Sequence, residues 1–288
     1  MKAILIAYWA LFLFLAACGT QQHATRFKKE AVGPSVAKLL DSILQEGLDN
    51  EALYTLAARI KPMSSVVSFA YPIANTDTVA KRVADIVDPV RDRPYLDSLQ
   101  RIQQALNALE IPDIKLVLSP FRATYSGKRI LQVNAIRISL LDSVLKAEER
   151  FFGQFGLVPG ADPAVVVNTI EYEDKYERLR GYGYLFGYPP YAVDFFVEAF
   201  HRSDTSGKHV ERDFFQIPVH TRDDGHFVYA IPKGHQPASD LDSALYRRAV
   251  NVLESYRAAR MEYLNGDSTL RAVQLLQDLQ GDQYHHPM

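Results

Sequence analysis

The sequence has one cysteine, Cys18, so no disulfide can form within a single chain. Long hydrophobic runs are also missing. The uncharged run Ala3 to Ala17 has 15 residues, and as a helix it would extend about 22 Å, against about 30 Å for the hydrocarbon core of a bilayer. We therefore expect stability to come from packing, and we expect no membrane-spanning helix in this run.

A strong excess of one charge is absent as well. The chain has 32 Lys and Arg residues against 34 Asp and Glu residues, a formal charge of −2. Nucleic acids and anionic membrane surfaces attract clustered basic side chains, so neither is expected as an electrostatic partner. Hydrophobic residues make up 48% of the chain and charged residues 23%, which is typical of an ordinary globular protein.

Catalytic and cofactor motifs are also scarce. The chain lacks the Gly-x-Ser-x-Gly, G-x-x-x-x-G-K-[ST] and H-E-x-x-H patterns. Ser143 to Lys146 matches Ser-x-x-Lys, but it falls in a predicted amphipathic helix without the companion motifs of lactam-processing enzymes. We therefore expect no cofactor, and no enzyme class is indicated.

The N-terminus has the parts of a secretory signal: basic Lys2, a short apolar core and small residues at its end. The residues Leu15-Ala16-Ala17-Cys18 resemble the lipobox of bacterial lipoproteins. A buried free cysteine in a cytosolic protein is the alternative interpretation, but it leaves the flanking pattern unexplained. The resemblance implies cleavage before Cys18 and lipid attachment to that residue.

In that family the new N-terminal amine is acylated too, and two or more acyl chains suffice for stable anchoring. The residue after the cysteine is Gly19 rather than aspartate, which by the same resemblance favours the outer membrane, with the folded part facing the periplasm. The chain then divides into a signal peptide, a lipidated cysteine with its tether, one globular domain and a tail. These parts are residues 1–17, 18–33, 34–282 and 283–288, and the first part of the domain, 34–110, is predicted to be largely helical.

The pattern of apolar residues predicts an α+β or α/β fold, with a mixed central sheet of about five strands and several amphipathic helices. A hairpin is expected between Arg122 and Asn134, around Ser126-Gly127. A second is expected from strands 214–219 and 226–231, which flank the turn signal Asp224-Gly225. The segment Ala164 to Arg180 is ambiguous, since Asp162-Pro163 is typical of a helix start and Val165 to Val167 favours a strand.

The most distinctive segment, Arg180 to Tyr191, reads RGYGYLFGYPPY. Glycines let a backbone approach a ligand closely, and tyrosines offer flat faces with a polar end. Tyr182, Tyr184 and Tyr188 are therefore candidate ligand-binding residues, with Arg180 holding an anion or carboxylate. The alternative, which we prefer, is a tight connection between helices whose tyrosines pack in the core.

Two polar clusters are weaker candidates. Glu171, Glu173, Asp174 and Glu177 could supply paired carboxylates for acid/base chemistry, but charge runs interleaved with basic residues are more typical of an exposed surface. His220, Asp223, Asp224 and His226 surround the second hairpin and include metal-ligand types. A turn explains the aspartates equally well, so we expect no metal and retain His220, Asp223 and His226 only as weak candidates.

Two functional hypotheses follow. The preferred one is a membrane-anchored envelope lipoprotein without enzymatic activity, which binds an unknown protein or small molecule through the Gly/Tyr segment. The rival is a periplasmic or surface hydrolase, with a site near Arg180 and either Glu171/Glu173 or His220/His226. The absence of motifs favours the first only mildly, because active sites are often assembled from residues distant in sequence.

Replacing Cys18 by Ser is expected to leave an unprocessed or mislocalised precursor with an unchanged fold, because the thiol serves as the lipid attachment point and lies in the tether. Membrane fractionation of cells fed a labelled fatty acid measures this. Lipid label that persists on the Cys18→Ser chain would contradict the assignment.

Overall fold

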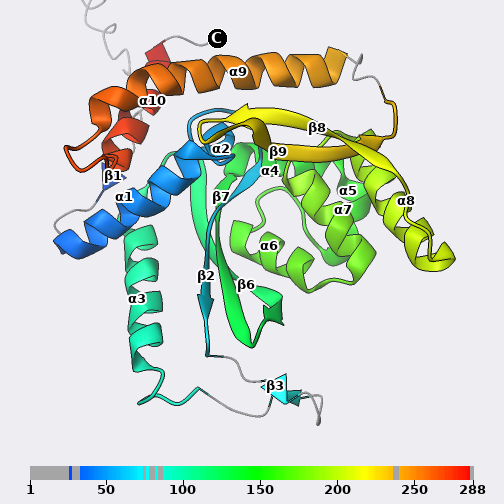
Figure 1. Cartoon of the computed structure of the whole chain (residues 1–288), viewed down its shortest axis with the longest axis horizontal. Coiled ribbons are helices and arrows are strands. Elements are labelled where there is room, and N and C mark those ends of the chain that lie inside the picture. Colours follow the sequence, from blue (N-terminus) through cyan, green and yellow to red (C-terminus); the bar gives the residue numbers. More distant parts are fainter. Residues whose placement is uncertain are drawn as a thin grey trace, which may run out of the picture.

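A computed structural model describes residues 26–27, 33–73, 76–77, 82–83, 87–235 and 240–285. Within these residues the fold is a mixture of helices and antiparallel strands, as predicted (Figure 1). The predicted central sheet of about five strands is wrong, because the longer strands form a three-stranded sheet and a separate two-stranded hairpin. Alternating hydrophobicity identifies strands, but it does not specify which distant edges will pair.

The three-stranded sheet consists of β2 (Met63–Tyr71), β7 (Lys128–Arg137) and β6 (Ile114–Tyr125), with β7 in the middle. The predicted hairpin around Ser126-Gly127 is confirmed as the connection between β6 and β7. Both turn residues have positive φ, 49° and 71°. This is the backbone conformation that two-residue hairpins require, and glycine adopts it without strain.

Helices cover both faces of this sheet. On one side, α1 (Pro34–Asp49) and α3 (Arg93–Ala108) contact β2 and β6 respectively (Figure 1). On the other side α6 (Pro163–Tyr172) lies against β6. The remaining helices are α2 (Leu53–Leu56), α4 (Ile138–Ala147), α5 (Glu149–Phe152), α7 (Lys175–Leu185), α8 (Pro190–Ser206), α9 (Asp240–Arg260) and α10 (Ala272–His285). None of the helices in the described ranges is both long enough and apolar enough to cross a membrane.

The second hairpin joins β8 (Arg212–Val219) to β9 (Arg222–Pro232), and it packs between α8 and α9. The hairpin was predicted, but its turn was misplaced: the chain reverses at His220-Thr221, and Asp224-Gly225 falls within β9. Contacts with α1 and the residue that follows it explain the position. The Thr221 N–H donates to the carbonyl oxygen of Asp49, 3.1 Å away, and the Thr221 hydroxyl donates to Asn50.

The ambiguous segment Ala164 to Arg180 forms parts of two helices, so the strand alternative at Val165 to Val167 is wrong. The Asp162 carboxylate accepts hydrogen bonds from the N–H groups of Ala164 and Val165 and thereby caps α6. This cap, together with Pro163 at the first helical position, outweighs the weak preference of valine for strands.

Helix α7 continues through the first half of the Gly/Tyr segment, and only residues 186–189 form the connection to α8. Its glycines allow close helix packing. A Cβ atom on Gly181 would lie 2.7 Å from the Ile170 side chain on α6, and one on Gly183 would lie 2.8 Å from Val193 on α8. The glycine pattern therefore reflects contacts between α7 and its two neighbours.

Alanine at Gly181 or Gly183 is expected to lower the free energy of unfolding by about 1–3 kcal/mol, because the added methyl group overpacks a helix interface. Gly153 is a matched control, since it has helical φ and ψ angles and a methyl group added there would meet no atom within 4 Å. Gly153→Ala should be neutral or stabilising by less than about 1 kcal/mol. Urea unfolding measures all three, and equal effects would contradict the packing role.

Candidate functional site

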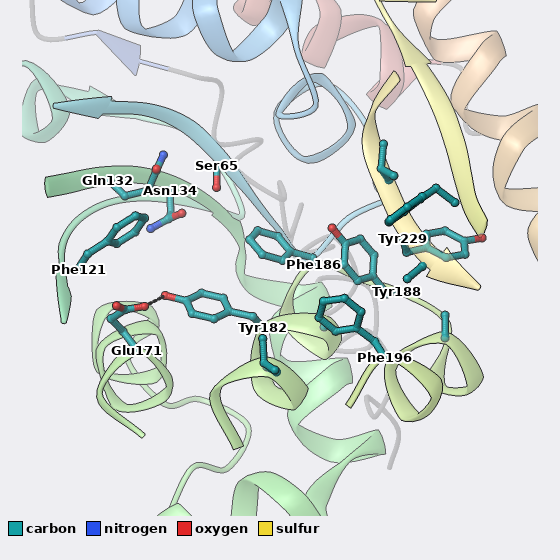
Figure 2. Close-up of a pocket in the computed structure, with 16 residues that line it drawn as sticks. Ser65, Phe121, Gln132, Asn134, Glu171, Tyr182, Phe186, Tyr188, Phe196 and Tyr229 are labelled. Atoms are coloured by element: carbon teal, nitrogen blue, oxygen red, sulfur yellow. Dashed lines mark hydrogen bonds between the residues drawn. The ribbon is translucent and has the colours of Figure 1, made fainter. Parts of the chain in front are cut away.

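A cavity of about 420 Å³ lies between the sheet, the helices α6 to α8 and the β8–β9 hairpin (Figure 2). Six segments distant in sequence contribute to its wall. The lining residues are Ser65, Phe121, Gln132, Asn134, Glu171, Leu179, Tyr182, Gly183, Phe186, Tyr188, Ala192, Phe196, Phe214, Val228, Tyr229 and Ala230. The volume is within the range of small-molecule sites, roughly 300–1,000 Å³.

Aromatic rings form most of the wall. Tyr182 stacks on Phe186 with ring centroids 5.6 Å apart, and Phe186 lies 5.8 Å from Tyr188. Tyr188 in turn lies 5.5 Å from Tyr229 on β9. The Tyr229 hydroxyl donates to the fully buried Asp242 at 2.6 Å, which fixes this ring from behind. The result is a continuous aromatic surface whose members hold one another in place.

The opposite end of the cavity is polar and contains Glu171, which is only 8% exposed. One carboxylate oxygen accepts the Tyr182 hydroxyl and the other accepts the Arg122 N–H, both at 2.7 Å (Figure 2). Burial, followed by the hydrogen bond to Glu171, raises the pKa of Tyr182 well above its usual value. The Tyr182 hydroxyl therefore remains a hydrogen-bond donor to Glu171.

A bulge in β6 makes this arrangement possible. The pairing of β6 with β7 changes register between Pro120 and Thr124. Such an irregularity re-aims side chains and frees backbone groups from the sheet. Here it places Phe121 on the cavity wall and directs the Arg122 N–H to Glu171.

The sheet side of the cavity also carries polar groups. The amide of Gln132 is occupied, since it donates to the carbonyl oxygens of Val67 and Val133 and accepts from Ser68. Asn134, two residues further along β7, is only 3% exposed, and its amide has no hydrogen-bond partner among the described residues.

Ser65 lies directly opposite Asn134 in the β2–β7 register and borders the cavity beside it (Figure 2). In the described part of the chain its hydroxyl also has no hydrogen-bond partner. Ser65 is half-buried, whereas Asn134 is buried, and buried polar groups are nearly always hydrogen-bonded. A free buried amide beside a free hydroxyl at a cavity wall is a feature of binding sites.

The four ligand-binding candidates from the sequence are divided by the structure. Tyr182 and Tyr188 line the cavity. Tyr184 instead packs against Phe151 in the core beneath α7. Arg180 lies outside the cavity lining, where its guanidinium pairs with Asp194 and donates to the Tyr184 hydroxyl at 3.2 Å. The helical periodicity of α7 explains the division, because residues 182 and 184 point about 200° apart around a helix.

The acidic cluster is also divided. The exposed-surface interpretation is wrong for Glu171, which is buried in the cavity wall. Glu173 and Asp174 lie at the break between α6 and α7, and Glu177 lies in the first turn of α7. None of these three lines the cavity. The carboxylates are therefore not paired at one site.

Of the three weak metal candidates, only His220 has a side chain that the structure describes. His220 lies 3.9 Å from an Asp49 oxygen that also accepts a hydrogen bond from Arg260, and burial lowers the pKa of His220. The side chains of Asp223 and His226 lie outside the described residues, so their role stays a prediction. Among the described residues, no group of three metal-ligating side chains is found.

Cys18 also lies outside the described residues, so lipid attachment stays a prediction.

Sequence reasoning missed three site residues: Asn134, Ser65 and Phe121. A signal was present in β7, where polar Gln132 and Asn134 alternate with Val133 and Ala135. Such a strand has one polar and one apolar face, but alternation alone does not reveal that both faces are covered.

Tyr182→Phe is expected to lower the free energy of unfolding by about 1–3 kcal/mol, because it removes a donor from a buried carboxylate. Tyr172→Phe is the matched control, since Tyr172 is 52% exposed and should change stability by less than about 0.5 kcal/mol. Urea titrations of both variants measure the difference. Equal stability of the two variants would mean that the Tyr182 hydroxyl contributes nothing to holding Glu171.

Comparison with known proteins adds no functional information: no family model, no curated protein and no solved structure matches the chain. The geometry of the cavity is therefore the basis for a functional proposal.

Proposed function

We propose that this chain is a lipid-anchored envelope protein whose folded domain binds a small, largely apolar ligand in the cavity. One observation carries the binding proposal: a cavity of about 420 Å³ with an aromatic wall at one end and unpaired polar groups at the other. This combination of apolar surface with a few placed polar groups is characteristic of small-molecule sites.

A packing defect is a poor explanation for a space of this size. Protein interiors are close-packed, and voids larger than a water molecule are few. A defect would also leave Asn134 and Ser65 without hydrogen bonds at no benefit, whereas a ligand would supply their partners. The aromatic rings that define the wall are held by contacts with one another, so the cavity is formed before a ligand arrives.

The anchor is supported by the sequence alone. The lipobox Leu15-Ala16-Ala17-Cys18 ends the apolar run, and a polar stretch from Gly19 to Arg26 follows it. Gly19 favours the outer membrane, with the domain in the periplasm. A binding domain on a lipid anchor would then capture its ligand at that membrane.

The hydrolase alternative has less support. Of its proposed residues with described side chains, Glu171 alone borders the cavity, while Arg180 pairs with Asp194 and His220 lies beside Asp49. Among the described residues that line the cavity there is no histidine, lysine or cysteine that could activate a nucleophile or serve as one. A binding site therefore explains the described residues better than a hydrolytic one.

Ala230→Phe tests the binding site by filling it, since Ala230 is buried on β9 and lines the cavity. Naphthylethanol, a neutral and mainly apolar probe, should bind the purified full chain. Its affinity for the Ala230→Phe variant should be at least about ten-fold lower, because the added phenyl ring fills the space that the naphthyl ring of the probe would occupy. Fluorescence titration in a nonionic detergent measures the affinity. Because every variant is measured in the same detergent, the partition of the probe into micelles affects all of them equally.

The matched control is Ala258→Phe, which adds the same ring at an exposed position of α9. It should leave probe binding unchanged. Equal affinities for Ala230→Phe and Ala258→Phe, at unchanged melting temperature, would show that the probe does not occupy the cavity and would contradict the proposed function.

A further inference from the structure

The cavity lining is electrostatically one-sided. Among the described lining residues Glu171 is the single acidic one, and none is a lysine, arginine or histidine. Among the described residues no basic group lies within ion-pair distance of the Glu171 carboxylate. A buried carboxylate without a counter-ion is costly, and the cost falls when a cation enters.

The polar end of the cavity also has hydrogen-bond acceptors that are not used. Each Glu171 oxygen accepts one hydrogen bond, from Tyr182 or from the Arg122 N–H, and each retains a free lone pair. The oxygens of Asn134 and Ser65 are available as well, because neither side chain has a partner in the described part of the chain. Several acceptors thus face the cavity from two opposite walls (Figure 2).

Aromatic faces border the same end. Phe121 projects from the β6 bulge near Glu171, and the Tyr182 ring stacks on Phe186 where the polar end meets the aromatic wall (Figure 2). The face of an aromatic ring carries partial negative charge and attracts a cation within about 6 Å. Carboxylate, free acceptors and ring faces therefore favour the same chemical group.

We propose that the ligand carries a protonated primary amine on an apolar body, and this inference rests on the proposed binding function. The ammonium group donates three hydrogen bonds, and it is held between Glu171 on α6 and the Asn134–Ser65 pair on the sheet. The apolar body lies against the aromatic wall toward Tyr188. Fatty acids and other anions are excluded, because the lining offers them a buried negative charge and no cation.

Three probes with the same naphthyl body and head groups of similar size test the head group: naphthylethylamine, naphthylethanol and the anion of naphthaleneacetic acid (naphthylacetate). The amine should bind the full chain at least about ten-fold more tightly than the alcohol, since a hydrogen bond to a charged group is worth more than a neutral one. Naphthylacetate should bind most weakly of the three. Equal affinities of amine and alcohol would overturn the amine proposal.

Glu171→Gln tests the counter-ion, and its expected effect is an about ten- to hundred-fold loss of naphthylethylamine affinity, larger than its effect on naphthylethanol. Glu173→Gln is the matched control, because it removes the same charge two residues away and outside the cavity lining. A preference for the amine that survives Glu171→Gln, or that falls equally in Glu173→Gln, would overturn the assignment of Glu171.

Asn134→Leu provides a second test if Glu171→Gln fails to fold. Replacing an unpartnered buried amide by a side chain of similar size should keep or raise the melting temperature, while amine affinity falls more than alcohol affinity. Unchanged amine affinity would overturn the role of Asn134. Loss of the amine preference while naphthylethanol still binds leaves the cavity proposal intact, whereas failure of all three probes to bind would contradict the proposed function itself.

Discussion

The side chain of Lys61 is fully buried. The arrangement of the elements around the cavity depends on the contacts that hold its ammonium group. This group donates to a Glu51 oxygen at 2.6 Å and lies 4.2 Å from the centre of the Phe227 ring and 5.3 Å from that of Phe186. Burial lowers the pKa of Lys61. A charge this deep costs several kcal/mol unless its partners are well placed, so the three contacts must be satisfied together.

Those partners come from three separate parts of the chain. Glu51 follows α1, Phe227 belongs to β9, and Phe186 is in the connection between α7 and α8. Gly187, with φ of 74°, brings that connection against Pro62, where a Cβ atom would lie only 2.8 Å from the proline ring. The lysine and the close approach beside it therefore fix Phe186, and with it part of the aromatic wall, against the start of β2.

The sequence predicted correctly those features that depend on neighbouring residues, and it missed those that depend on contacts between distant parts of the chain. The Ser126-Gly127 turn was predicted correctly because two positive φ angles favour these residues. The turn at His220-Thr221 was missed because its position depends on hydrogen bonds to Asp49 and Asn50, which are about 170 residues away in the chain. Burial of Glu171 was missed for the same reason: its donors come from the β6 bulge and from α7, and neither contact is encoded next to it.

The Gly/Tyr segment shows how one pattern can satisfy two requirements. Gly181 and Gly183 bring α7 close to α6 and α8, and this proximity directs Tyr182 toward Glu171. Binding and packing were weighed as alternatives from the sequence, yet in the structure the packing of the glycines places Tyr182 in the cavity wall. A larger residue at Gly181 would push α7 away from α6, and Glu171 would lose its tyrosine donor although Gly181 does not line the cavity. An unpaired buried amide and a carboxylate without a cation meet at this cavity, and such local inconsistencies are expected where a functional demand retains them.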